Sequence, residues 1–383
     1  MMKKENLALF SLCVLVFSVS LLTIFKNPDC PFHVDYAQYV KSIEEFKSNG
    51  ILNDGINGKY AYIFLMMVLA APLKLLGWSL YSSIVFITSI FQVFLVILFY
   101  KYTNSLTKTI LMSTTLTFLT FMGQPETVII ASFYLMLYFV YRDKPLSELF
   151  IMLASFVRID FAVFYLFSRK RAALLPMGIT GIYFIFLRLL TNHIYFIHSD
   201  FGINKHPISA LIVFIIGYGA YLLLFVTAKP KNDRLDLLIL WVIVLFLVFF
   251  LKFPTQKVFF FPILLTFMFY DFKIKGIPIT TLAIPLVVVN LLFAGYIHYH
   301  RLNECTPKAF NDYALSHNES AYFGVFEPYL SYYGTNESPP YKYQITINCK
   351  NATDYFKAED WRNAQLLYRP YKFCAEPWDG RYE

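Results

Sequence analysis

The sequence predicts an all-α polytopic membrane protein with about 11 transmembrane segments and a small mixed α/β cap at its C-terminal end. Three observations lead to this fold class. Hydrophobic residues make up 57% of the 383-residue chain and charged residues 15%, against about 45–50% and 25% in soluble domains. Apolar runs of up to 21 residues recur between short charged loops, and the chain becomes polar after residue 300. A soluble globule does not bury so large an apolar fraction.

We divide the chain into a membrane domain, residues 1–300, with a large first outer loop at 26–59, and an extracytoplasmic C-terminal domain, residues 301–383. The apolar stretches of the membrane domain are expected at 7–25, 60–76, 80–100, 109–122, 127–141, 146–157, 161–167, 172–190, 208–228, 235–251, 258–270 and 277–297. A helix needs about 20 residues to cross the hydrocarbon core. We therefore expect 109–122, 146–157 and 161–167 to be tilted, broken or packed inside the protein.

The first stretch, 7–25, begins after two lysines and has no small-residue cleavage site behind it, so we expect an uncleaved anchor with a cytoplasmic N-terminus. If 60–76 is re-entrant or lies on the surface, every later basic loop falls inside, as the positive-inside rule favours. In the rival topology 60–76 spans the membrane and 146–167 is one crossing, which puts the loop at 142–144 outside. We prefer the first topology. The basic residues concerned are Lys101, Lys108, Arg142, Lys144, Arg169, Lys170, Arg171, Lys229, Lys231, Arg234, Lys273 and Lys275.

Charge is unevenly distributed along the chain. The net charge is +8, but residues 301–383 carry 9 Lys/Arg and 11 Asp/Glu, which is −2, so the membrane domain carries +10. Positive-inside loops account for such an excess. We therefore expect membrane lipid as a partner and no nucleic acid. Both topologies put the tail outside, on the cell surface or, in a eukaryotic host, in the lumen of the endoplasmic reticulum.

The tail has two features of an extracytoplasmic domain. It holds the N-glycosylation sequons, at Asn318, Asn336 and Asn351, and we expect a strand near 341–348. With one cysteine of the first outer loop, its cysteines form an even outer set that allows three pairings in an oxidising compartment. The set is Cys30, Cys305, Cys349 and Cys374. If all four are oxidised, one disulfide ties the tail to the first outer loop; otherwise some thiols are free.

The densest group of polar residues lies in the first outer loop. Apolar residues at helical spacing predict an amphipathic helix that begins at Asp35 and ends before Gly50, with its apolar face on the membrane surface. Asp35 opens this helix, with Gln38 three residues later. From the residues alone, Asp35 is either the helix N-cap or a functional carboxylate.

The same loop resembles a known enzyme family. The outer loop comes directly after the first membrane helix. Its helix opens with the Asp-x-x-x-Tyr pattern of Asp35 to Tyr39 and closes on Gly50. Lys59-Tyr-Ala-Tyr62 and an apolar segment that ends at Gly77 follow. This pattern resembles the GT-C membrane glycosyltransferases, over about residues 7–270. Members often carry an Asp-Glu pair here, whereas this chain has Asp35-Tyr36.

The resemblance implies transfer of a sugar from a polyprenyl-phosphate carrier to an acceptor on the extracytoplasmic side. It implies that Asp35 is the base or a metal ligand, and that Glu126 is the second acidic group. Such a transfer needs a carboxylate to accept the proton of the acceptor hydroxyl and positive charge beside the departing phosphate. The substrate-binding candidates are Lys252, Lys257, Arg158, His33 and Tyr39.

Each candidate also has a structural interpretation. Lys252 and Lys257 flank an outer boundary where lysines extend to the interface, and Glu126 follows a turn at a helix start. Arg158 is two residues from Asp160, and the simplest interpretation is an internal ion pair that makes a helix break tolerable. The sharper hypothesis directs Arg158 at a phosphate.

The cofactor that bridging carboxylates would hold is a divalent cation, Mg²⁺ or Mn²⁺, and Asp35 is its candidate ligand. The sequence has no compact metal signature, no P-loop and no dinucleotide fingerprint. Two other classes stay open. One is a transporter or flippase for a lipid-linked substrate, and the other is a non-catalytic GT-C-like assembly protein. The sugar, the acceptor and the carrier length are not encoded in any recognisable motif.

Overall fold

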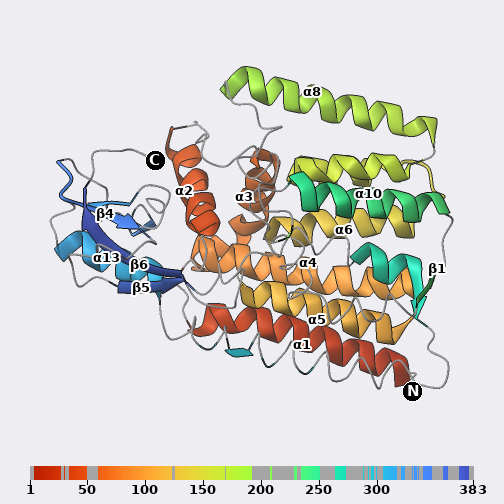
Figure 1. Cartoon of the computed structure of the whole chain (residues 1–383), viewed down its shortest axis with the longest axis horizontal. Coiled ribbons are helices and arrows are strands. Elements are labelled where there is room, and N and C mark those ends of the chain that lie inside the picture. Colours follow the sequence, from red (N-terminus) through yellow and green to blue (C-terminus); the bar gives the residue numbers. More distant parts are fainter. Residues whose placement is uncertain are drawn as a thin grey trace. The chain divides into compact units, whose positions relative to one another are not determined.

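Figure 1 shows the computed structural model of the chain. The residues that it describes are 4–26, 30, 34–49, 59–122, 126–168, 170–191, 208, 228–230, 234–250, 264–272, 288, 292, 295–296, 299, 305–316, 321–323, 330, 332–333, 335, 340–346, 357–360 and 371–378. Over these residues the protein is mostly helical, as the sequence predicts. The chain forms two compact units. Unit 1 comprises residues 1–22, 57–62 and 86–295, and unit 2 comprises 23–56, 63–85 and 296–383.

In the described residues, unit 1 consists of helices and one short antiparallel pair of strands. Its helices are α1 (Lys4–Lys26), α4 (Leu80–Thr103), α5 (Leu106–Met122), α6 (Glu126–Val140), α7 (Glu148–Val157), the 3₁₀-helices η2 (Ile159–Phe167) and η3 (Arg171–Ala173), α8 (Leu174–Thr191) and α10 (Arg234–Phe250). Only the part of α1 up to residue 22 and the part of α4 from residue 86 belong to this unit. β1 (Ala228–Pro230) pairs antiparallel with β2 (Tyr270–Phe272).

Aromatic contacts hold α4 between α1 and α6. The ring of Phe86 lies 5.8 Å from that of Phe17 on α1, and Phe91 lies 5.1 Å from Phe133 on α6. In Figure 1 the axes of α1, α4 and α6 run in nearly the same direction. These edge-on ring pairs are a favourable geometry for aromatic packing.

A broken helix follows α6, as the short apolar stretches predict. α7 has 10 residues and ends at Val157, Arg158 is extended with φ −146° and ψ 118°, and η2 then continues for 9 residues as a 3₁₀-helix. Such a long 3₁₀ run is uncommon and often marks a functional or strained segment. Because η2 runs back along α7, residues 146–167 are not a single crossing.

Hydroxyl side chains lie inside unit 1. Thr109 and Thr115 of α5 and Ser155 of α7 are buried and donate hydrogen bonds to the carbonyl four residues earlier, at 2.8 to 3.1 Å. This local bonding satisfies the hydroxyls without water. Large apolar side chains are exposed instead, among them Phe10 at 61%, Ile182 at 68% and Leu189 at 75%.

The structure corrects the expected number of membrane spans. Among the described residues, α4 is the one helix long and apolar enough to cross a membrane, with 24 residues and a hydropathy of 2.4 in its best window. The other apolar helical stretches have 10–17 residues over the part of the chain that the structure describes, for example Glu5–Val19 within α1 and Arg171–Leu187 over η3 and α8. A crossing needs about 20. About 11 spans are therefore not supported by the described residues, because several apolar stretches form short or broken helices.

Unit 2 combines two early helices with the tail. Its elements are α2 (Val34–Asn49), α3 (Tyr60–Leu75, from residue 63), α13 (Thr306–Ser316), β3 (Ala321–Tyr322), β4 (Tyr343–Thr346), β5 (Lys357–Asp360) and β6 (Tyr371–Pro377). After α3, Gly77 has φ +86° and the N–H of Trp78 bonds to the carbonyl of Leu73 at 3.1 Å. This is the Schellman arrangement, in which a glycine takes the left-handed position.

The tail forms the mixed α/β arrangement that the sequence predicts. The sheet order is β3-β4-β6-β5, with β3 parallel to β4 and the other pairs antiparallel. Figure 1 shows α13 beside this sheet. β4 lies within the strand expected at 341–348. The unit, however, also contains residues 23–56 and 63–85, so the first outer loop groups with the tail instead of with the membrane domain.

Candidate functional site

The structure places the backbone of the two acidic candidates. Asp35 is the second residue of α2, which begins at Val34, so it lies in the first helical turn instead of at the N-cap position before the helix. Glu126 is the first residue of α6. Their side chains are not among those described. A carboxylate in a first helical turn is favoured by the helix dipole, and both positions have that property.

Several other predicted residues lie outside the described part of the chain. They are His33, Lys252, Lys257, Cys349, Asn318, Asn336 and Asn351. The hypothesis that Lys252 and Lys257 bind a phosphate therefore stays a prediction, as do the three sequons.

The apolar face of α2 packs against protein, which corrects the expectation of a membrane-surface helix. The ring of Tyr36 lies 5.5 Å from that of Tyr81, and Phe46 lies 5.2 Å from Phe64 on α3. Tyr39 is fully buried, with its ring 6.4 Å from that of Tyr36. A fully buried ring favours packing over substrate contact for Tyr39. The periodicity of α2 thus reflects burial between elements of unit 2.

The tail holds α2 in two ways. Ala37 is fully buried in one apolar cluster with residues of α13 and of the tail sheet, including Phe310 and Ala375. Cys30, just before α2, forms a disulfide with Cys305, just before α13, with the Cα atoms 6.0 Å apart. This is a link between the tail and the first outer loop, one of the pairings that the sequence leaves open. The helix that carries Asp35 is therefore fixed to the tail.

The structure describes two further cysteines. Cys374 of β6 is fully buried and disulfide-bonded, and Cys13 is free. The outer cysteine that the sequence leaves for Cys374 is Cys349. Because Cys349 lies outside the described residues, a Cys349–Cys374 pair stays a prediction.

Arg158, at the break between α7 and η2, is held by a bidentate ion pair. Its Nε lies 3.0 Å from Oδ1 of Asp160 and its Nη2 lies 2.8 Å from Oδ2. Nη1 lies 3.4 Å from Oγ1 of Thr127, the residue after Glu126. The two side chains of the pair are 14% and 18% exposed. The structure thus brings the break beside the start of α6, and it adds Asp160 and Thr127 to the site.

The other end of the same helices carries the basic loops. Arg142 pairs with Asp236 of α10 at 3.5 Å and donates to the carbonyl of Phe167, and Lys170 donates to the carbonyl of Arg142. Lys101 of α4 donates to the hydroxyl of Tyr141 at 3.1 Å. Basic loops that are far apart in sequence therefore meet at one end of unit 1. The sequence predicts that they share one side of the membrane.

A buried carboxylate lies next to this basic end. Glu148 opens α7 and is 2% exposed. Ser147 donates to its Oε2 at 3.0 Å and Ser168 donates to its Oε1 at 3.2 Å. These bonds join the start of α7 to the residue after η2. The sequence does not single out Glu148 as a functional residue, because a glutamate after a short polar turn is typical of an ordinary helix start.

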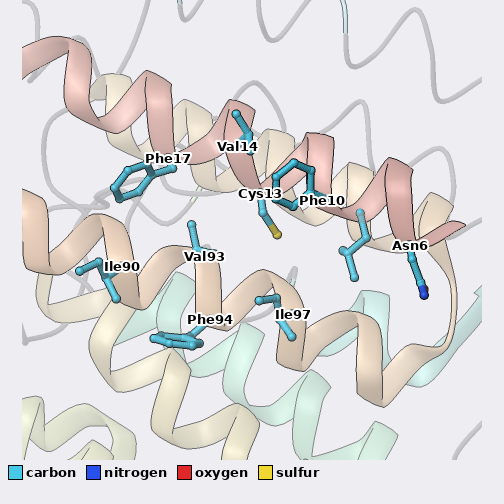
Figure 2. A pocket seen from close by; sticks show the side chains of 10 residues that line it. Asn6, Phe10, Cys13, Val14, Phe17, Ile90, Val93, Phe94 and Ile97 are labelled. Atoms are coloured by element: carbon cyan, nitrogen blue, oxygen red, sulfur yellow. The ribbon is translucent and has the colours of Figure 1, made fainter. Parts of the chain in front are cut away.

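An apolar groove lies between α1 and α4, with a volume of about 560 Å³. Figure 2 shows Phe10, Cys13 and Phe17 of α1 facing Ile90, Val93 and Ile97 of α4, with Asn6 at one end. Among its lining residues, Asn6 and Cys13 are the polar ones, and no predicted site residue is present. This groove suits hydrocarbon, and it offers no group for acid–base chemistry.

Among the described residues, no three His, Cys, Asp or Glu side chains are placed to hold a metal ion. The side chain of Asp35, the candidate ligand, is not among those described, so the cation stays a proposal. No protein-family model, no curated protein and no solved structure matches the chain.

Proposed function

We propose that the chain is an integral membrane glycosyltransferase that moves a sugar from a polyprenyl-phosphate carrier to an acceptor on the extracytoplasmic side. The membrane location rests on the inverted distribution of polarity in unit 1. Hydroxyls are buried in α5 and α6, while large apolar side chains are exposed on α1, α8 and α10. Monomeric soluble proteins rarely expose large apolar patches, whereas buried hydroxyls between apolar helices are common in membrane bundles.

The observation that carries the transferase proposal is the arrangement at the start of α6. Arg158 is held by Asp160 within reach of Thr127, next to the helix start that carries Glu126. A guanidinium fixed at a helix break is suited to a phosphate. Because Asp160 takes the Nε and Nη2 edge of Arg158, the proposal directs the Nη1 side at the phosphate. This end lies opposite the basic loops around Arg142, and the proposal assigns it to the outer side.

Asp35 is the proposed general base. In this role its carboxylate accepts the proton of the acceptor hydroxyl while the hydroxyl oxygen attacks the anomeric carbon, and the bond from that carbon to the carrier phosphate breaks. The attachment of α2 to the tail, through the Cys30–Cys305 disulfide and the cluster around Ala37, supports a fixed position for such a residue. Catalytic groups work when rigid elements hold them.

A second candidate function is a transporter or flippase for a lipid-linked substrate. The break at Arg158 favours it, because charged groups in discontinuous helices are typical of transporters. Purified protein in detergent, incubated with a panel of polyprenyl-phosphate sugars and acceptors, separates the two. A transferase releases carrier phosphate and forms a glycosylated product in detergent. A transporter forms no product there, but moves the intact lipid-linked sugar between the leaflets of reconstituted vesicles.

A further inference from the structure

In the turn between α6 and α7, an exposed apolar residue has an unfavourable backbone conformation. Leu146 has φ 67°, a left-handed conformation that is an outlier for a bulky residue. Its side chain is 70% exposed. Glycine or asparagine satisfies such a turn more readily, so a leucine here indicates a use for the side chain beyond the turn itself.

Leu146 lies in a region where exposed leucines and exposed cations come from two neighbouring segments. Arg142 contacts the carbonyl of Phe167, and Lys170 contacts the carbonyl of Arg142. These contacts bring residues 141–147 beside residues 166–168 and 170–175. The exposed side chains of these segments form what we call the basic leucine patch. Its leucines, 57% to 72% exposed, are Leu146, Leu166, Leu174 and Leu175, and its cations are Lys144, Lys170 and Arg171. Asp143 is the exposed acid in the described part of the two segments.

We propose that the basic leucine patch binds anionic phospholipid headgroups, with its leucines inserted among the upper acyl carbons. Three exposed cations against one exposed acid complement a phosphate-rich surface, and exposed leucines between cations are the composition of interfacial membrane segments. The inference rests on the proposed membrane location, but not on transferase chemistry. It assigns this end of unit 1 to the anionic face of the membrane.

The proposal is tested on the full chain in neutral detergent by adding phosphatidylglycerol or phosphatidylcholine and measuring the thermal unfolding midpoint. The charge variant is Lys144→Gln with Arg171→Gln, and the matched control is Lys47→Gln with Lys308→Gln, two exposed lysines of unit 2. We expect phosphatidylglycerol to raise the midpoint of the wild type and the control more than phosphatidylcholine does. In the charge variant the concentration for half-maximal effect should rise several-fold.

Leu146→Gly separates lipid contact from turn formation. Because glycine accepts the left-handed conformation, the variant should unfold at the wild-type temperature or above it without lipid, yet gain less from phosphatidylglycerol. Equal responses to the two lipids, or a charge variant with the full wild-type response, would overturn the proposal. Recovery of the chain in the soluble fraction of lysed cells would instead refute the membrane location, a result visible before any lipid is added.

Discussion

The guanidinium of Arg158 and the carboxylate of Asp160 face each other across a two-residue spacing, with Nη2 2.8 Å from Oδ2 and Nε 3.0 Å from Oδ1. Arg158 is the extended residue between α7 and η2. The ion pair therefore links the break to the first turn of η2 by side chains, where the backbone helix is interrupted. The proposed phosphate-binding role of Arg158 uses the same rigid placement.

Asp160→Asn should destabilise the protein by about 1–3 kcal/mol, because it leaves N–H groups of a largely buried guanidinium without their charged acceptor. Arg158→Gln combined with Asp160→Asn should recover part of this loss, since no uncompensated charge remains. Thermal unfolding in detergent of the single and double variants gives the coupling free energy. Fully additive losses would show that the pair contributes nothing to stability.

The two sides of unit 1 can be assigned by cysteine labelling. In a Cys13→Ser background, Lys144→Cys and Arg171→Cys should react with a membrane-impermeant maleimide from the same side, because their segments are joined through Arg142. Lys308→Cys, on α13 of the tail, should react from the opposite side. Labelling of positions 144 and 171 from different sides would restore the rival topology.

The Cys30–Cys305 disulfide closes a sequence separation of 275 residues. Cys30→Ser with Cys305→Ser should lower the free energy of unfolding by roughly 2–5 kcal/mol and make the tail more sensitive to protease. Peptide mapping without reduction should recover the Cys30–Cys305 and Cys349–Cys374 pairs. A Cys30–Cys349 or Cys30–Cys374 peptide would refute the attachment of α2 described above.

Two apolar residues of α13 that differ in burial test the packing of the tail core. Phe310 of α13 is fully buried in the cluster with Ala37, whereas Leu315 of the same helix is 55% exposed. Phe310→Ala should cost about 3–5 kcal/mol of stability, and Leu315→Ala much less. Similar unfolding temperatures for the two variants would show that α13 does not pack on α2 in this way.

The sequence anticipates the break at Arg158 for a physical reason. Stretches 146–157 and 161–167 are too short to cross a membrane, and Arg-Ile-Asp supplies the charges that make a break tolerable. The position of Thr127 beside Arg158 could not be predicted, because it depends on how α6 and α7 pack. The mixed cap around β4 was predictable from the polar, turn-rich composition of the tail.

Other features required the structure. Periodicity shows that one face of α2 is covered, but not whether lipid or protein covers it; Tyr36 and Tyr81 show that it is protein. Four outer cysteines allow three pairings, so the sequence cannot choose the partner of Cys30. The estimate of about 11 spans counted apolar stretches, but apolar composition does not reveal that α7 and η2 form a hairpin.

The most direct test of the transferase proposal compares Asp35→Asn with Glu44→Gln, an exposed acid on the same helix α2, in transfer from polyprenyl-phosphate sugars. If Asp35 is the base, Asp35→Asn should lose about 10²–10⁴-fold in transfer rate, while Glu44→Gln keeps the wild-type rate and both variants keep the wild-type unfolding temperature. Full transfer activity in Asp35→Asn would contradict the assignment of the base, and with it the central chemical step of the proposed function.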